Sequence, residues 1–317
     1  MSDGQSEIST CIYVDSSKSF NSSCSDGLSL NSSNTSSTSL YSKSDNDSSC
    51  ESADFSDDSL SFNSSNTSST NLYSESDNDS SSESVDFSDD LHVYYTNADN
   101  LLNKFDEFEM FISLNNVDVA VVTEVFPKNL KATNIDSCEY SMKGFTCFKS
   151  EIEESSRGVV IYVRNTIPAD YCSVLKQNKF KESVWCVLRL SNGKELLIGG
   201  VYKSPSSSSE NVRQLNALLT QASALNYEHL VVLGDFNFPE IDWDSWTVNR
   251  NENHPSFSFI ECLRDNFLTQ HVNFYTRYRD GQDPSCLDLL LSDNLTQIEG
   301  MKINGKLGLS DHISFTF

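Results

Sequence analysis

The sequence predicts an α/β fold for residues 91–317, in which a two-sheet β-sandwich is flanked by helices, and a disordered region for residues 1–90. Three observations support this fold class. Stretches with strand character outnumber those with helical periodicity. Several predicted strands are continuous apolar runs, which is typical of sheets covered on both faces. The composition also changes near residue 91, where aromatic and β-branched residues replace a serine-rich sequence.

The first ninety residues are acidic and of low complexity, with 34 serines and with 17 acidic side chains against Lys18 and Lys43. A 32-residue unit at 29–60 is repeated at 61–92. Because each unit has too few apolar residues to bury a core, we expect disorder rather than a repeat fold. Serines followed by acidic residues suit a kinase that prefers acidic sites. A solvated spacer, produced by slippage of repetitive DNA, explains the repeat as well.

The remainder of the chain alternates between helical and strand patterns. Residues 100–114 and 207–225 carry apolar side chains at helical spacing. Ser207 and Glu210 have the spacing of a capping box at the start of the second helix. The stretches with strand character are 92–96, 117–123, 158–163, 183–190, 195–202, 229–233, 286–291 and 313–317.

The charge and the cysteines restrict the class of protein. A formal net charge of -24 excludes a broadly basic nucleic-acid-binding surface, so a polyanionic substrate would have to be held by a metal ion or by a local basic patch. The nine cysteines are scattered without a CxxC pair, which favours reduced thiols. The sequence has neither a signal-peptide pattern nor an apolar run of membrane-spanning length. We therefore expect a nuclear or cytoplasmic protein that is not secreted and does not contact a membrane.

Polar side chains follow several of the predicted strands. In the stretch HLVVLGDFNFPEIDW, residues 229–243, Asp235 and Asn237 come directly after an apolar run. Turn chemistry alone would account for one such pair. The pattern recurs, however, at Asn97, Asp99, Glu124, Tyr202, Asp288, Asp311 and His312. Because ligand sites gather where strand ends converge, the sequence predicts a single functional site made of these side chains.

The same segments resemble a known superfamily. In order along the chain, YYTNAD, VVTEVF, GGVYKSP, VVLGDFNFPEIDW, SCLDLLLSDN and LSDH resemble the endonuclease/exonuclease/phosphatase superfamily. They look most like the endonuclease domain of jockey-type non-LTR retrotransposons. The resemblance covers residues 91–317. It implies a four-layer, deoxyribonuclease I-like sandwich and a monomeric, metal-dependent hydrolase, derived from a retrotransposon, that nicks DNA.

The resemblance also implies a metal site. Phosphodiester hydrolysis requires that charge on the phosphoryl group be neutralised, and Mg²⁺ favours a few carboxylates and waters as ligands. Glu124 is then the principal ligand, and Asp99 and Asp311 are candidates for the same position or a second one. Mg²⁺ is the expected cofactor, with Mn²⁺ as a substitute.

The remaining strand-end residues acquire catalytic roles from the resemblance. Asp235 takes a proton from the attacking water, Asn237 fixes the water and the phosphate, and Asn97 orients Asp235. His312 meets the developing negative charge, while Asp288 holds its ring and favours the imidazolium form. Tyr202 adds a phenolic hydroxyl to the phosphate. The basic residues near the motifs are the candidate phosphate contacts, namely Arg157, Lys203, Arg277, Arg279, Lys302 and Lys306.

Two other functions remain open from the sequence. A phosphatase or RNase of the same fold would use the same residue types, because this fold does not determine the substrate. A catalytically idle relic could act as an interaction protein through its acidic N-terminal region. The enzyme is favoured over the relic because each motif position carries a chemically competent residue.

Overall fold

The computed structural model describes residues 90–128, 134–153 and 156–317. The predicted disorder of residues 1–90 falls, except for residue 90, outside the described residues, so it stays a prediction, as does the boundary near residue 91. The strands are β1 (Val93–Asn97), β2 (Val119–Thr123), β3 (Phe145–Lys149), β4 (Val159–Arg164), β5 (Ala169–Tyr171), β6 (Ser183–Arg189), β7 (Glu195–Tyr202), β8 (His229–Asp235), β9 (Ile241–Asp242), β10 (Thr247–Val248), β11 (Thr269–Gln270), β12 (Asp288–Ser292), β13 (Lys302–Lys306) and β14 (Ile313–Thr316). The α-helices are α1 (Phe105–Leu114), α2 (Ser173–Lys176), α3 (Ser209–Ser223) and α4 (Pro255–Asp265).

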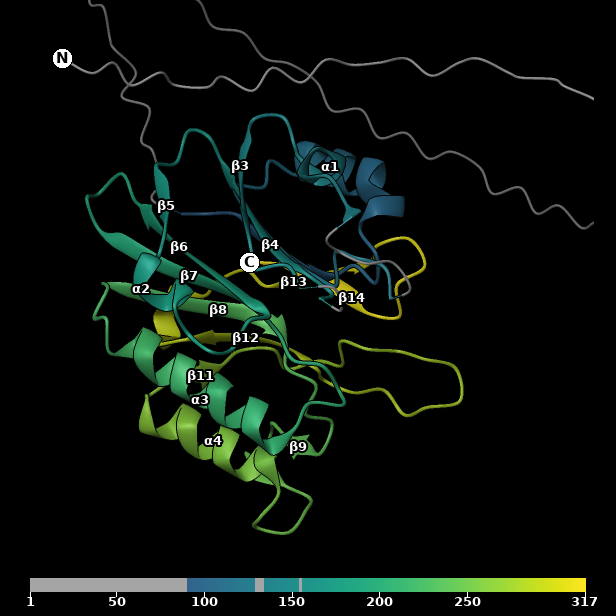
Figure 1. The fold of residues 1–317 in the computed structure, drawn as a ribbon, viewed down its shortest axis with the longest axis vertical. Coiled ribbons are helices and arrows are strands. Elements are labelled where there is room, and N and C mark those ends of the chain that lie inside the picture. Colours follow the sequence, from purple (N-terminus) through teal and green to yellow (C-terminus); the bar gives the residue numbers. More distant parts are fainter. Residues whose placement is uncertain (1–89, 129–133, 154–155) are drawn as a thin grey trace, which may run out of the picture. The chain divides into compact units, whose positions relative to one another are not determined.

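Two six-stranded sheets form the centre of this domain (Figure 1). Their strand orders are β13-β14-β1-β2-β4-β3 and β11-β12-β8-β7-β6-β5. β1 pairs in parallel with β2, and β7 pairs in parallel with β8, whereas the other neighbours are antiparallel. α1 covers the outer face of the first sheet, and α3 with α4 covers the outer face of the second. The predicted two-sheet sandwich flanked by helices is confirmed.

The strands with continuous apolar sequences are buried on both faces of their sheet, as expected. In β8, Val231 and Leu233 face the core between the two sheets. Leu230 and Val232 point the other way, into the core beneath α3 and α4. Each side chain therefore leaves water, at a gain of about 1.5–3 kcal/mol for a fully buried Val or Leu.

The predicted helices are present, but one end differs from prediction. The N-cap of α3 is Ser208, whose side chain accepts a hydrogen bond from the Asn211 N–H at 3.2 Å. The predicted capping box at Ser207 is wrong, because the Ser207 N–H closes a turn onto the Ser204 carbonyl at 3.0 Å. The sequence analysis missed α4, whose N-cap is His254 rather than a residue with a short polar side chain.

The directions of the strands in the two sheets place the strand ends that carry polar residues at one end of the sandwich. The carboxyl ends of β1, β2, β7 and β8 lie there together with the amino ends of β12 and β14. Gly234, just before Asp235, permits the close approach of β8 to β7, because a Cβ there would lie 2.0 Å from the Val201 carbonyl oxygen. No helix among the described residues has the length and apolarity needed to cross a membrane.

Candidate active site

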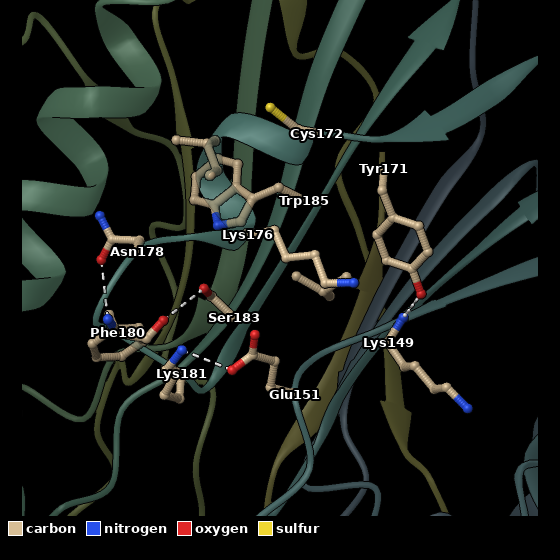
Figure 2. A pocket seen from close by; sticks show the side chains of 12 residues that line it. Lys149, Glu151, Tyr171, Cys172, Lys176, Asn178, Phe180, Lys181, Ser183 and Trp185 are labelled. Carbon is tan, nitrogen blue, oxygen red and sulfur yellow. Dashed lines mark hydrogen bonds and ion pairs between the residues drawn. The ribbon is translucent and has the colours of Figure 1, made fainter.

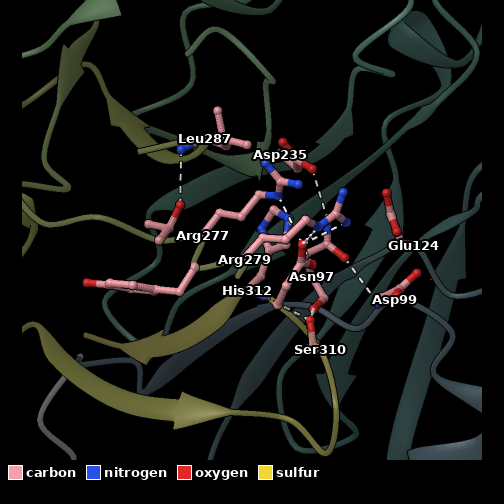
Figure 3. Close-up of polar contacts among 12 residues, drawn as sticks. Asn97, Asp99, Glu124, Asp235, Arg277, Arg279, Leu287, Ser310 and His312 are labelled. Atoms are coloured by element: carbon pink, nitrogen blue, oxygen red, sulfur yellow. Dashed lines mark hydrogen bonds and ion pairs between the residues drawn. The ribbon is translucent and has the colours of Figure 1, made fainter. Parts of the chain in front are cut away.

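The predicted site residues come from both sheets and lie at the end where those strand ends meet (Figure 3). Most of them are buried, whereas Asp99, Asn237 and Asp311 are half-buried. Asp288 makes two short hydrogen bonds. Its Oδ2 lies 2.6 Å from Nδ1 of His312, and its Oδ1 accepts the Tyr95 hydroxyl at 2.6 Å. Asp288 belongs to one sheet, whereas Tyr95 lies in the other and His312 directly precedes a strand of that other sheet. These contacts join the two sheets across the interface.

His312 is held as a cation by its neighbours. Burial disfavours the charged ring, but the Asp288 carboxylate, together with Asp235 and Asp311, outweighs burial and raises the pKa of His312 to about 9. The backbone N–H of His312 donates to Ser310 Oγ at 3.2 Å, and Ser310 Oγ donates to the Asn97 carbonyl at 2.8 Å. Nδ1 is engaged by Asp288, so Nε2 is the nitrogen left to donate to another group.

Asp235 lies directly opposite Asp288 in the antiparallel pair of β8 and β12. Burial and the Asp288 charge raise the pKa of Asp235 well above its usual value, although His312 opposes the shift. Asn97 Nδ2 donates to Asp235 Oδ2 at 2.9 Å, and the Asn237 N–H donates to Asp235 Oδ1 at 3.1 Å. We call Asp235, Asp288 and His312 the aspartate–histidine half of the site.

A second group of charged residues comes from the turns after β1 and β2 and from the segment before β4. Arg157 donates from Nη2 to Glu124 Oε2 and, at 2.8 Å, to Asp99 Oδ1, while its Nη1 donates to the Phe126 carbonyl at 2.7 Å. Burial raises the pKa of Asp99, but Lys128 and Arg157 outweigh it and lower that pKa below the usual value. We call Asp99, Glu124 and Arg157 the carboxylate–arginine half of the site.

The third predicted metal ligand, Asp311, pairs with two arginines other than Arg157. Its Oδ2 accepts Nε of Arg277 at 3.0 Å and Nε of Arg279 at 2.8 Å, and Oδ1 lies 3.8 Å from His312 Nε2. Burial raises the pKa of Asp311, whereas the charges of His312, Arg279 and Arg277 lower it and determine the net direction. Asp311 thus anchors two arginines beside the site.

Asn237 and Tyr202 complete the predicted set. Asn237 Nδ2 donates to the Lys203 carbonyl at 2.9 Å, and Lys203 Nζ donates back to the Asn237 carbonyl at 3.0 Å. Tyr202 is buried next to Glu124, and burial together with that carboxylate raises the pKa of its phenol well above 10. Tyr202 is therefore a neutral hydroxyl at physiological pH.

Several of these residues have a left-handed backbone. Asp99 has φ of 39°, Glu124 has φ of 52° and Asn237 has φ of 48°. A positive φ is uncommon for residues other than glycine, and such strain concentrates at functional sites. The turns after β1, β2 and β8 therefore aim their side chains at a backbone cost that burial and hydrogen bonds offset.

The donor atoms suit a divalent cation. In the described part of the chain, Asp235, Asp288 and His312 form a group whose potential ligand atoms lie within 4.8 Å of one another. Two carboxylates and an imidazole suit a transition metal, but Nδ1 of His312 is already bound to Asp288. Glu124 and Asp99 instead share one guanidinium, an arrangement of oxygens that a hard cation such as Mg²⁺ also fits.

A basic pocket lies farther along the sandwich, between β3, β5 and α2 (Figure 2). Lys181 Nζ pairs with Glu151 Oε2 at 2.7 Å, and Lys176 Nζ lies 5.4 Å from the centre of the Tyr171 ring. Lys149 ends β3, at the same end of its sheet as Glu124. The sequence analysis did not single out this pocket, in which Lys181 pairs with Glu151 while Lys176 and Lys149 lie over the rings of Tyr171 and Tyr140.

The sequence analysis missed Tyr95 and the pairing of Arg157 with Glu124, both of which determine the geometry of the site. Tyr95 precedes Asn97 by two residues, and strand alternation places both side chains on the face toward the other sheet. The sequence therefore carried a signal that could have added Tyr95 to the site. Arg157 was predicted as a phosphate contact, but it is buried against Glu124. The pairing of Arg157 with Glu124 could not be predicted from a local sequence pattern, because the two residues lie 33 positions apart in the chain.

Known proteins resemble the chain in sequence and in structure. A family model described as Endonuclease-reverse transcriptase matches residues 196–316. No curated protein sequence matches the chain. The structure is similar to the endonuclease domain of TRAS1, a telomere-specific non-LTR retrotransposon, with a TM-score of 0.54 at 17% identity over 72% of this chain and 97% of that one.

Two further solved structures share the fold. One is the 3′ phosphatase NExo from Neisseria bound to a product DNA hairpin, with a TM-score of 0.53 at 16% identity over 72% of this chain and 98% of that one. The other is an AP endonuclease from Archaeoglobus fulgidus, with a TM-score of 0.50 at 12% identity over 71% of this chain and 98% of that one. The resemblance indicated by the strand-end motifs is confirmed.

Proposed function

We infer from the deoxyribonuclease I-like fold, which this chain shares with the endonuclease/exonuclease/phosphatase superfamily, that it is a metal-dependent phosphodiesterase that nicks DNA. The observation that carries this proposal is the contact across the two sheets between Asp288 and His312, beside Asp235 held by Asn97. A base, an acid and a candidate metal site then surround one point, as hydrolysis of a phosphodiester requires.

Asp235 is the proposed general base. Burial and Asp288 raise its pKa, and a carboxylate with a raised pKa accepts a proton from water more readily. Asn97 fixes Oδ2 of Asp235, and the Asn237 N–H fixes Oδ1, so the carboxylate cannot rotate away from the water. Asn237 would also position the phosphate from the same turn.

His312 is the proposed donor to the phosphate. With a pKa of about 9 the ring is charged at neutral pH, and its Nε2 would donate to a non-bridging oxygen as negative charge develops there. Asp288 and the Tyr95 hydroxyl hold the ring and its counter-charge in place. The neutral hydroxyl of Tyr202 would add a second donor.

Glu124 and Asp99 are the residues that would hold Mg²⁺ or Mn²⁺. When bound, the cation would supply neutralisation of the phosphoryl charge. The Arg157 guanidinium pairs with both carboxylates and so balances the charge of buried Glu124. Asp311 is proposed as the anchor of Arg277 and Arg279, which would contact phosphates on the His312 side.

DNA is the proposed substrate for two reasons. Arg277 and Arg279 supply local positive charge in a chain that is acidic as a whole. Structures with this fold include a retrotransposon endonuclease domain and a phosphatase bound to a DNA hairpin. The second of these is a 3′ phosphatase, so release of phosphate from a DNA 3′ end is the alternative activity. Derivation from a retrotransposon is proposed from the same likeness.

The Asp235→Asn variant tests the proposal. It keeps the size and turn preference of the residue but removes the base, so plasmid nicking should fall about 10²–10⁴-fold with the melting temperature near that of the wild type. Asp244→Asn, at an exposed aspartate nine residues along the chain, is the matched control. Equal nicking by the wild type and Asp235→Asn would refute the catalytic role. Release of inorganic phosphate without nicking would favour the phosphatase.

A further inference from the structure

Leu309 is a large apolar side chain that is 96% exposed beside the candidate active site. It lies in the turn between β13 and β14, three residues before His312. Its neighbours Leu307 and Ser310 are buried, at 3% and 1% exposure. A chain segment of three residues spans at most about 10 Å, so the Leu309 side chain lies close to the proposed reaction centre.

The turn that carries Leu309 is held by hydrogen bonds on both sides. The Ser310 N–H donates to the Leu307 carbonyl at 3.1 Å, and Ser310 Oγ donates to the Asn97 carbonyl at 2.8 Å. The Gly308 N–H donates to Glu107 Oε1 at 3.0 Å, and Gly308 has φ of +52°. Leu309 is therefore presented to solvent by a fixed turn and is not exposed because the segment is loose.

Near this apolar tip the basic side chains Lys104, Lys306, Arg277 and Arg279 outnumber the carboxylates of Glu107, which accepts the Gly308 N–H, and Asp311, which accepts both arginines. Arg279 binds Asp311, two residues after Leu309, and its side chain keeps 48% exposure. Lys306 is exposed three residues before Leu309, with Nζ 3.4 Å from the Tyr278 carbonyl. The stem of Lys104 packs on Gly308, where an added Cβ would lie 3.1 Å from its Cδ. In a chain of net charge -24, this local charge complements a polyanion.

We propose that Leu309 is a wedge that enters the base stack of duplex DNA next to the phosphate held at His312, with Lys306 and Arg279 on the flanking phosphates. This inference rests on the proposed function and deepens it, because it names base-paired DNA as the substrate class. Apolar side chains inserted at a base step unstack it partially and bend the duplex. A phosphomonoester or a mononucleotide offers no base step to such a side chain.

Binding of a short DNA duplex tests the wedge without cleavage. The full chain carrying Asp235→Asn is titrated with a fluorescent duplex that contains 2-aminopurine, and anisotropy gives the Kd while 2-aminopurine emission reports unstacking. Adding Leu309→Ser should weaken the affinity about 10-fold or more and abolish the rise in emission, because the burial of a leucine side chain is lost. Leu309→Met should restore both, since it keeps the apolar volume.

Leu114→Ser is the matched control. Leu114 is 74% exposed at the end of α1, at the opposite end of the sandwich from Glu124, so duplex affinity should not change. Lys306→Gln should lower the slope of log affinity against log salt by about 1, as expected for one phosphate contact.

The outcomes that overturn the wedge are distinct from those that overturn the function. Equal duplex affinity of Leu309→Ser and its parent, absence of duplex binding, or equal dependence on Leu309 with single-stranded DNA would each overturn it. So would a wild-type dimer that Leu309→Ser converts to monomer, because a second copy would then cover the side chain. The proposed function fails separately, if the wild type hydrolyses neither plasmid nor the small diester bis(p-nitrophenyl) phosphate.

Discussion

The aspartate–histidine half and the carboxylate–arginine half of the site differ in how their charges are balanced. In the first, Asp288 is satisfied on both oxygens by Tyr95 and His312. In the second, Glu124 and Asp99 share Arg157, and Asp99 remains partly exposed. In the first half both oxygens of Asp288 have protein partners, whereas in the second Arg157 pairs with both carboxylates and Lys128 Nζ lies 3.6 Å from Asp99 Oδ1.

The difference indicates a division of labour. A buried network with every partner present holds protonation states far from their ordinary values, as the raised pKa of His312 and of Asp235 illustrates. Glu124 and Asp99 supply carboxylate oxygens, the ligand type that hard divalent cations take, and the Asp99 side chain is open to solvent. Proton transfer is therefore expected from the first half and metal binding from the second.

Removal of His312 should have the largest effect of the variants in this section. His312→Ala deletes the proposed donor, and loss of one such donor costs about 10²–10³-fold in kcat. His92→Ala, at the far end of β1, is the control and should retain activity. Plasmid nicking under single-turnover conditions measures both. A loss confined to KM would place His312 in binding rather than in chemistry.

The pH dependence of kcat/KM should show the protonation states of the first half. The pKa of His312 is raised to about 9, so activity that needs the charged ring is present below this value and falls as the pH rises through it. Asp288→Asn removes the charge that raises this pKa, and the alkaline limb should move toward the ordinary value near 6.5. An alkaline limb that Asp288→Asn leaves in place would assign it to another group.

The same pKa predicts how stability varies with pH. Because the folded-state pKa of His312 lies above its unfolded value, its contribution to the free energy of unfolding is complete below about pH 6.5. That contribution is lost as the pH rises through about 9. Urea unfolding of the wild type should show this decline, and His312→Asn should lack it.

Glu124→Gln should affect chiefly the second half, with a lowering of the Asp235 pKa because the Glu124 charge contributes to raising it. Loss of a charged ligand should raise the Mg²⁺ concentration for half-maximal nicking by about 10-fold or more, with the alkaline limb unchanged. Glu252→Gln, at an exposed glutamate, is the control. Titration of Mg²⁺ against nicking rate measures the effect, and an unchanged requirement would remove Glu124 from the metal site.

Tyr202→Phe should have the smallest effect. The variant removes one neutral hydroxyl that would contact the phosphate, and a hydrogen bond of this kind contributes about 0.5–1.5 kcal/mol, or roughly 2- to 12-fold in rate. Tyr227→Phe is the control on the same sheet's helical side. A loss as large as that of His312→Ala would make Tyr202 a principal donor.

Much of the fold could be predicted because burial on both faces leaves a strong local signal. All the predicted strand stretches contain a strand of the structure, from β1 to β14, and both predicted helices are present. The elements that were missed are short or lie at sheet edges, such as β3, β5 and β13, where side chains are exposed and apolar runs are absent. α4 was missed because Phe257 and Phe259 alternate as in a strand.

The sequence by itself determined most of the strands and the strand-end positions of the polar residues, because both follow from local periodicity and from the position of each residue within its strand. The two-sheet sandwich was implied by the resemblance of the strand-end motifs. Only the tertiary structure decided which charges meet. Asp288 finds His312 and Tyr95, Glu124 finds Arg157, and Asp311 finds two arginines. These partners lie far apart in the sequence, and their pairing depends on the packing of two sheets, which no local pattern encodes.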